Sequence, residues 1–332
     1  MFKSKYTDLI DIKANSTVII GLSGGPDSVF LLSLLAQVKH EKGLTLMAAH
    51  LDHEWRAGSV HDAEWCQALC DSLDIPLIIA RASDITLIQK PSGSKEDLGR
   101  QLRRQFFEQL VQEYSADAIA LGHHAGDQEE TFFIRLIRGA TLTGLTGIKK
   151  QDGIYWRPLL NLSKQEILEQ LEQEEISYLE DPSNHSADFL RNRIRQAIVP
   201  ALKECDSRFE KNFTRTLSNI QESEQFLQEL TKQACLSVID TELKLDVQEL
   251  KAYKAFMQKR ILVHWLCESN VPFTISATFI DEIIRFLSHD RGGCHEIHPQ
   301  WGIEKKKHLA SIFYRTQTAT TDLEPERSQP EA

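Results

Sequence analysis

A short loop of small and polar residues is the part of this sequence best suited to chemistry. It is Ser23-Gly24-Gly25-Pro26-Asp27-Ser28, and it lies between an apolar run at 17–20 and a second one at 29–35. The first run is typical of a buried strand and the second of a helix, whose first turn accommodates Pro26. A strand-to-helix loop presents N–H groups to phosphate, and its glycines allow close backbone approach. The residues therefore predict a phosphate-binding loop, with a ligand-free turn as the alternative.

The spacing of the loop excludes two common nucleotide motifs. No lysine follows the glycines as it does in Gly-x-x-x-x-Gly-Lys-Ser/Thr, and the pattern is not Gly-x-Gly-x-x-Gly either. The loop resembles the Ser-Gly-Gly-x-Asp-Ser loop of the N-type ATP pyrophosphatase, or PP-loop, superfamily. The resemblance implies that residues 23–28 bind the pyrophosphate of ATP, that Asp27 helps to hold Mg²⁺, and that AMP is transferred to a substrate oxygen.

Strand-like and helix-like segments alternate over the first two hundred or so residues. This order predicts an α/β fold with a doubly wound, mainly parallel sheet. Ligands of such sheets lie at the carboxyl ends of the strands, so the loop at Ser23 should lie beside His50 and His123. The expected strands are 17–20, 44–51, 76–80 and 118–122, and the expected helices are 62–73, 95–114, 127–138 and 163–174.

The remaining segments predict a catalytic domain at 1–205, a smaller C-terminal α+β domain at 206–315 and a disordered tail at 316–332. Helices are expected at 189–202 and 208–234. In the C-terminal domain we expect a strand at 243–247, helices at 250–268 and 274–287, and a hairpin of 297–303 with 309–314.

Net charge, apolar runs and cysteine spacing limit the kinds of protein that this sequence can represent. The net charge of −10 argues against a nonspecific polyanion binder, although basic residues cluster locally. No apolar run is long enough to span a membrane, and no signal-peptide pattern is present. The six cysteines form no Cys-x-x-Cys pair, which indicates reduced thiols in a cytoplasmic protein. Oligomeric state is left open, with a homodimer among the options.

Further segments resemble one branch of the superfamily, the tRNA(Ile)-lysidine synthetases. They are His50-Leu51-Asp52-His53-Glu54-Trp55-Arg56, the helix start at 95–104, Gly122-His123-His124-Ala125-Gly126-Asp127-Gln128-Glu129-Glu130-Thr131, Arg157-Pro158-Leu159-Leu160, Asp181-Pro182-Ser183-Asn184 and Arg191-Asn192-Arg193-Ile194-Arg195. The sequence departs from the family pattern at Gly99, where alanine is usual, and at Gly126, where the family has an aspartate.

The resemblance implies a ligase that uses ATP, Mg²⁺, free L-lysine and a tRNA(Ile) with a CAU anticodon. The wobble cytidine would be adenylated and then attacked by lysine, which gives lysidine. The implied ATP-site residues beyond the loop are His50, His53 and His123. The implied catalytic residues are Asp27, Arg100, Arg103, Asp127 and Glu130, with Asp27 and Asp127 as Mg²⁺ ligands. The implied tRNA contacts are Arg56, Arg138, Arg191, Arg193, Arg195, Lys305 and Lys306.

Other interpretations of the same residues remain open. A PP-loop tRNA thiolase would activate a base in the same way, but such enzymes usually carry the paired Cys-x-x-Cys motifs that this sequence lacks. A nucleotide-binding module without catalysis is the second alternative, and Gly126 is the residue that favours it. His50 and His53 could also form a metal pair, but no third ligand lies at a spacing typical of zinc.

Overall fold

A computed structural model describes residues 2–55, 59–87, 95–180, 190–273 and 276–315. The chain divides into two compact units, Met1–Gln221 and Glu222–Ala332. The division falls within helix α10 (Phe209–Val238), later in the chain than the boundary expected after residue 205. The expected tail at 316–332, Arg56 and the segment 181–184 lie outside the described residues.

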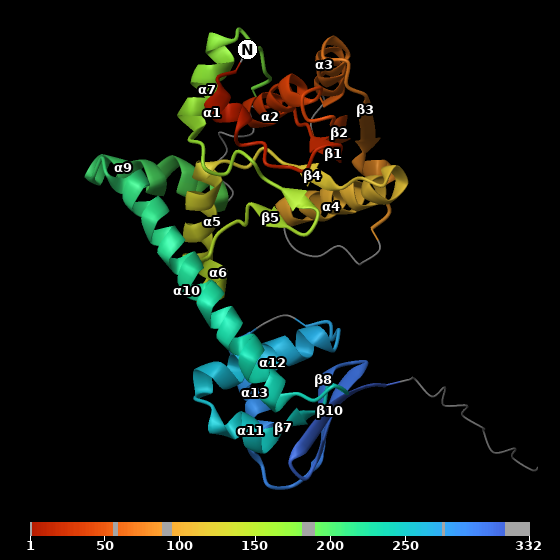
Figure 1. The fold of residues 1–332 in the computed structure, drawn as a ribbon, viewed down its shortest axis with the longest axis vertical. Coiled ribbons are helices and arrows are strands. Elements are labelled where there is room, and N and C mark those ends of the chain that lie inside the picture. The colour runs from red at the N-terminus through yellow and green to blue at the C-terminus, as the bar shows by residue number, and fades with distance from the viewer. Residues whose placement is uncertain (1, 56–58, 88–94, 181–189, 274–275, 316–332) are drawn as a thin grey trace, which may run out of the picture. The chain divides into compact units, whose positions relative to one another are not determined.

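A six-stranded sheet forms the centre of the first unit, in the order β3-β2-β1-β4-β6-β5 (Figure 1). Neighbouring strands from β3 to β6 pair in parallel, and β5 pairs antiparallel with β6. The prediction of an α/β fold with a mainly parallel sheet is therefore confirmed. The strands are β1 (Thr17–Gly21), β2 (Thr45–Asp52), β3 (Leu77–Arg81), β4 (Ala118–Ala120), β5 (Gln151–Asp152) and β6 (Tyr155–Trp156).

Helices connect the strands and cover the sheet. They are α1 (Ser4–Thr7), α2 (Pro26–Val38), α3 (Ser59–Ser72), the 3-10 turn η1 (Ala82–Asp84), α4 (Lys95–Tyr114), α5 (Ala125–Ile137), α6 (Leu142–Leu145), α7 (Lys164–Gln173), α8 (Leu190–Arg193), the π-helical turn η3 (Ile194–Ile198), α9 (Val199–Cys205) and α10. The helix expected at 189–202 is thus interrupted. Pro200 explains part of this, because it lacks the N–H that a continuous helix would need.

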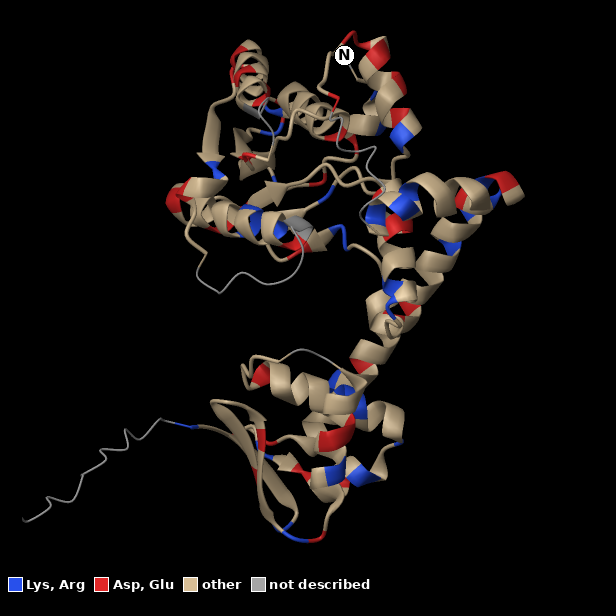
Figure 2. Ribbon diagram, turned by 180° about the vertical axis from the view of Figure 1, so that it is seen from behind, with Lys and Arg blue, Asp and Glu red and all other residues tan. Residues whose placement is uncertain are grey.

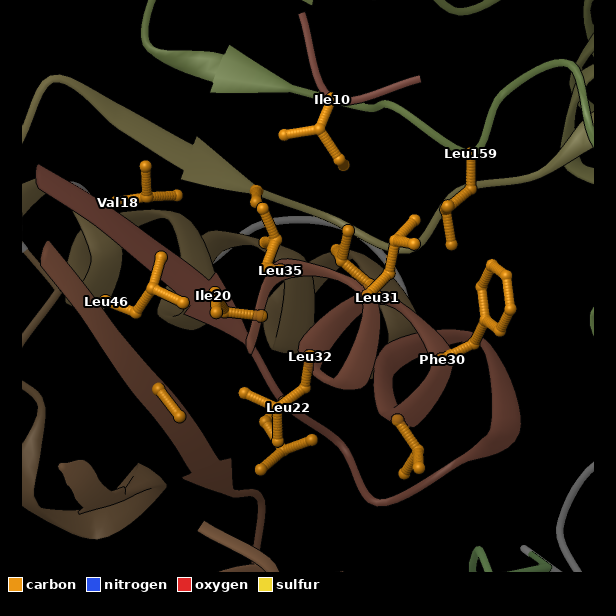
Figure 3. Packing of buried hydrophobic residues seen from close by; sticks show 14 of the residues in the cluster. Ile10, Val18, Ile20, Leu22, Phe30, Leu31, Leu32, Leu35, Leu46 and Leu159 are labelled. Carbon is orange, nitrogen blue, oxygen red and sulfur yellow. The ribbon is translucent and has the colours of Figure 1, made fainter. Parts of the chain in front are cut away.

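The alternation of side chains along β1 places a separate core on each face of the sheet. Val18 and Ile20 pack with α2 on one face, and Figure 3 shows them beside Leu31 and Leu35 of that helix. Ile19 packs on the other face with residues of α4 such as Phe107. Helix α2 is buried over most of its surface, which explains its almost continuous apolar sequence.

The second unit is α+β, as expected, although its elements differ from those predicted. A four-stranded antiparallel sheet has the order β7-β10-β9-β8, so the expected hairpin is extended by a third consecutive strand. The single helix expected at 250–268 is two helices, since the backbone is extended at Tyr253. The elements are β7 (Leu245–Asp246), α11 (Val247–Ala252), α12 (Ala255–Glu268), α13 (Ala277–Ser288), β8 (Gly293–His298), β9 (Trp301–Lys306) and β10 (Leu309–Tyr314).

A buried ion pair joins α10 to α12 inside this second unit. Both guanidinium NH groups of Arg260 donate to the carboxylate of Glu224, at 2.9 and 3.0 Å, and its Nε donates to Thr231. Glu224 is buried, so removal of one partner would leave a charge without compensation.

In the part of the chain that the structure describes, no helix is long and apolar enough to cross a membrane.

Truncation of Phe30 tests the core that supports the loop. Its ring is fully buried and makes edge contacts with Phe2 and Tyr6. We expect Phe30→Ala to lower the free energy of unfolding by about 3–5 kcal/mol, because it leaves a cavity. Urea unfolding measures this. Ile137→Ala, at a side chain that is 61% exposed, is the control and should change stability by no more than about 0.5 kcal/mol.

Candidate active site

The loop between β1 and α2 is held in one conformation by its own side chains. Gly24 has a positive φ of 81°, which favours glycine. The Ser28 hydroxyl donates to the carbonyl of Gly25 at 2.9 Å and accepts from the N–H of Ser23 at 3.1 Å. The first-turn amides of α2 have no intrahelical acceptor, and the helix dipole is positive there. The loop therefore fits an anion such as pyrophosphate.

The segment that ends at residue 180 contacts this loop. The N–H of Leu179 donates to the carbonyl of Gly24 at 2.9 Å. A Cβ atom on Gly24 would lie 2.6 Å from Cδ1 of Leu179, so the glycine is required for space as well as for its φ angle. Leu179 thus fixes the loop from outside, a contact that the sequence motifs did not reveal.

The loop after β4 lies directly against the start of α2. A Cβ on Gly122 would come within 2.9 Å of the carbonyl carbon and oxygen of Asp27. The short distance brings His123 and His124 to the same edge of the sheet as the loop. His50 lies there too, and its Nδ1 is 3.0 Å from the carbonyl oxygen of Leu22. The expected convergence of these segments is present.

His123 has a buried ring nitrogen, Nδ1, without a hydrogen-bond partner in the described structure. Burial lowers its pKa to about 4, and the charges of Arg157, Arg191 and Arg100 act in the same direction. The imidazole is therefore neutral near pH 7 and can exchange a hydrogen bond with a ligand. The positive charges of these arginines thus act on the edge of the sheet where the phosphate loop lies.

His53 belongs to a stacked pair beside helix α4. Its ring lies 4.6 Å from that of Trp55, and its Nε2 is 3.1 Å from a guanidinium nitrogen of Arg103. Burial, followed by the charge of Arg103, lowers the pKa of His53 to about 4. A Cβ on Gly99 would lie 2.6 Å from the Trp55 ring. Glycine at this position therefore lets the aromatic pair approach the helix.

Two acidic residues of α5, Asp127 and Glu130, form ion pairs with arginines. Asp127 accepts from Arg191 at 2.6 Å, and Glu130 accepts from Arg191 at 2.6 Å and from Arg195 at 2.5 Å. Basic and acidic stretches of the ribbon meet around α5 (Figure 2). Arg191 and Arg195, predicted to contact tRNA, thus form ion pairs with the carboxylates predicted to hold lysine.

Both oxygens of Asp127 are already engaged. One accepts from Arg191, and the other accepts from the backbone N–H of His124 at 2.9 Å. Burial alone would raise the pKa of Asp127, but His124 and Arg191 outweigh it and the pKa is lowered. Asp127 is therefore ionised, and each of its oxygens already has one hydrogen-bond partner in the protein.

The imidazole of His124 packs against the backbone of Gly126. Its Nδ1 accepts from the N–H of Gly126 at 3.0 Å, and a Cβ on residue 126 would lie 2.8 Å from the imidazole. Its Nε2 is 3.9 Å from a carboxylate oxygen of Asp27 and 3.7 Å from one of Asp127. The imidazole of His124 thus lies between the carboxylates of Asp27 and Asp127, next to the position where the family pattern has an aspartate.

The remaining expected residues are spread more widely. Arg100, Arg138 and Arg193 are exposed, as is Lys306, which pairs with Glu304 at 2.8 Å. The prediction that Lys305 contacts tRNA at the surface is wrong. Its side chain is 3% exposed and its ammonium donates to the carbonyls of Leu287 and His289.

Three residues near the loop were not predicted from the sequence: Leu179, His124 and Lys164. Lys164 Nζ lies 2.7 Å from a carboxylate oxygen of Asp27. His124 was visible in the His-His pair, but the pattern did not show which ring would face Asp27. Lys164 and Leu179 lie more than a hundred residues from the loop, so local spacing carried no signal for them.

A model of the PP-loop domain family matches residues 1–202. The chain belongs to the PP-loop family. The prediction based on the loop at 23–28 is thus confirmed. The fold agrees, since the U34-tRNA thiolase NcsA from Methanococcus maripaludis, which carries a [4Fe-4S] cluster, superposes with a TM-score of 0.55 at 20% identity. That superposition covers 66% of this chain and 79% of the thiolase.

Curated relatives named tRNA(Ile)-lysidine synthase are similar over most of this chain. The Bacillus cereus protein is 33% identical over 302 residues, which cover 86% of this chain and 63% of the relative. The Bacillus subtilis protein is 34% identical over 281 residues, which cover 81% of this chain and 59% of the relative. The chain therefore spans less than two thirds of the length of these proteins.

Two glycine substitutions test whether the backbone of the loop requires glycine at position 24. We expect Gly24→Ala to destabilise the protein by at least about 1–3 kcal/mol, because its φ is positive and Leu179 occupies the space. Gly25→Ala is the control, since φ is −71° there and the nearest atom to a Cβ lies at 3.6 Å. Urea unfolding should distinguish the two, and equal losses would contradict this account of Gly24.

Removal of Arg191 tests the ion-pair cluster. Arg191→Ala should lower the free energy of unfolding at pH 7 by about 2–3 kcal/mol, because two buried carboxylates lose a partner. The lowered pKa of Asp127 means that its contribution is present above the unfolded-state value and is lost as pH falls through the folded one. Stability measured against pH should therefore converge with the wild type at acid pH. Arg193→Ala, at an exposed neighbour, should have little effect at any pH.

Proposed function

We propose that this protein joins lysine to carbon 2 of the wobble cytidine in a CAU-anticodon tRNA(Ile), with cleavage of ATP to AMP and pyrophosphate. The observation that carries the proposal is the position of Asp127, which lies beside the PP-loop through His124 and shares Arg191 with Glu130. The similarity to proteins named tRNA(Ile)-lysidine synthase supports the choice of substrates. A cytoplasmic location is part of the same proposal.

The first half-reaction would place ATP on the loop. The loop at 23–28 would bind the pyrophosphate through backbone N–H groups such as those of Gly24 and Gly25 and through the N-terminus of α2, with the neutral His123 nearby. The carbonyl oxygen at carbon 2 of the cytidine attacks the α-phosphorus, and the bond to pyrophosphate breaks. Such a displacement depends mainly on positioning and on neutralised charge, for which Arg100 and Arg103 are suited.

Mg²⁺ would offset charge on the phosphates during this step. Asp27 fits as its protein ligand because the carboxylate lies in the first turn of α2 and is partly exposed. Asp127 would be the second carboxylate ligand, and His124 lies between it and Asp27. Carboxylates and phosphate oxygens are the ligands that Mg²⁺ commonly uses, with water completing its shell.

The second half-reaction would use the acidic residues of α5. The ε-amine of lysine attacks carbon 2, the bond to AMP breaks, and the amine gives up a proton. The mixed cluster of Asp127, Glu130, Arg191 and Arg195 suits a zwitterionic amino acid, whose ammonium group can pair with a carboxylate and whose carboxylate can pair with an arginine. Asp127 or Glu130 would also accept the proton.

Contacts with the tRNA backbone would come from exposed basic residues, among them Arg138, Arg193 and Lys306. The cytidine would be turned out of its loop to reach the site.

The thiolase alternative is disfavoured by the buried thiols of α3, because burial raises the pKa of Cys66 to about 12 and that of Cys70 to about 11. Such thiols are poor nucleophiles.

The deciding assay supplies unmodified CAU-anticodon tRNA(Ile), ATP and labelled lysine. We expect label in the RNA together with one AMP and one pyrophosphate for each lysine. A tRNA with a different wobble base is the control. ATP binding without any incorporation would leave a nucleotide-binding module, and incorporation of sulfur from a donor in place of lysine would favour the thiolase.

Asp127→Asn tests the lysine site within this assay. Loss of the charge should raise the KM for lysine roughly tenfold or more, at 1.4 kcal/mol per factor of ten, while ATP binding stays near the wild-type level. Asp71→Asn, on the exposed side of α3, should leave both unchanged. An unaltered KM for lysine in the Asp127 variant would remove this residue from the lysine site.

A further inference from the structure

The PP-loop of this chain contains no basic residue of its own. Its sequence from Ser23 to Ser28 has one charged side chain, Asp27, which is acidic. ATP brings several negative charges to the loop, and backbone amides supply only partial positive charge. Loops of the Gly-x-x-x-x-Gly-Lys type place a lysine on the phosphates for this reason. A cation for the phosphates must come from elsewhere in the fold.

The structure brings one basic residue to the loop from a distant segment. Lys164 is the first residue of α7, and its Nζ lies 2.7 Å from a carboxylate oxygen of Asp27. The side chain of Lys164 is 40% exposed and that of Asp27 is 28% exposed. The ammonium group is therefore close to the first turn of α2 and accessible to solvent and to a ligand.

The position of Lys164 is fixed by neighbouring contacts. Ser163 caps α7, because its hydroxyl accepts from the N–H of Glu166 and its own N–H donates to the Glu166 carboxylate. The carbonyl of Leu162 accepts from the N–H of Ala125 at 2.8 Å, which attaches this segment to the start of α5. Lys164 is thus held where α2, α5 and α7 meet.

A role in stabilising the fold does not account for the ion pair between Lys164 and Asp27. Partly exposed ion pairs contribute little to stability, and α7 is already secured by its cap and by the fully buried Ile167. Asp27 is also the residue expected to face Mg²⁺. When the metal engages Asp27, the ammonium of Lys164 loses its partner at the place where the phosphates arrive.

We propose that Lys164 is the phosphate-binding lysine of this site: it pairs with Asp27 in the free protein and with pyrophosphate oxygens when ATP binds. It then stabilises the negative charge that grows on the leaving pyrophosphate. The inference rests on the proposed ATP-dependent reaction, and it assigns to α7 the role that a lysine within the loop has in other nucleotide sites.

Calorimetric titration of the full chain with Mg²⁺-pyrophosphate, Mg²⁺-ATP and AMP tests the assignment. Lys164→Gln should bind pyrophosphate and ATP roughly tenfold more weakly, as expected for loss of one charge-assisted contact, and should bind AMP like the wild type. Lys164→Arg should retain most of the affinity. Lys150→Gln is the matched control, because Lys150 is 43% exposed and pairs with Asp11 at 2.6 Å away from the loop.

Unchanged or tighter pyrophosphate binding by Lys164→Gln would overturn the proposal, since it would mean that the lysine only competes for Asp27. Equal weakening for AMP and pyrophosphate would also overturn it, because the loss would then be one of general folding. These titrations need neither tRNA nor lysine. A wild-type protein that binds pyrophosphate but incorporates no lysine would therefore refute the proposed function and leave the role of Lys164 standing.

Discussion

The site depends on the close contact between the backbone at residue 122 and the first turn of α2. Any side chain at position 122 would collide with the carbonyl group of Asp27. This contact sets the distance between the phosphate loop and the start of α5, and therefore the distances from Asp27 to His124 and onward to Asp127. The parallel sheet makes it possible, because β1 and β4 are neighbours and end at the same edge.

The charges at this edge are balanced within the protein before any substrate arrives. Asp27 pairs with Lys164, Asp127 and Glu130 share Arg191, and Glu130 also pairs with Arg195. Burial would raise the pKa of Asp127, but the charges of His124 and Arg191 outweigh it and lower that pKa. When a charged substrate binds, each of these side chains can exchange its partner within the protein for a charged group of the substrate. The free-energy cost of removing the side-chain charges from water arises on folding, which leaves more of the binding free energy for selectivity.

The sequence was sufficient for features that are local in the chain. Apolar patterning and a contiguous motif were enough for the loop at 23–28, the helix at 95–114, the strand that contains His50 and the strand that precedes His123. The strands β5 and β6 were not predicted, because two residues give too short a pattern to recognise. The pairing of Arg191 with Asp127 could not be derived either, since it joins two helices that are distant in the sequence.

Lys305 shows a different kind of error. Three consecutive lysines suggested one basic surface, yet alternate residues of a strand point to opposite faces. Ile303 and Lys305 therefore share the buried face of β9, while Lys306 is exposed. The alternation was present in the sequence and would have separated the two lysines.

The inward direction of Lys305 also links a strand to the end of a helix. Its ammonium group binds carbonyls at the carboxyl end of α13, where the helix dipole is negative. An amine in this position is shielded from acylating reagents as long as β9 and α13 stay together. The rate at which Lys305 is acylated, compared with that of Lys306 next to it, would report how often the C-terminal unit opens in the native protein.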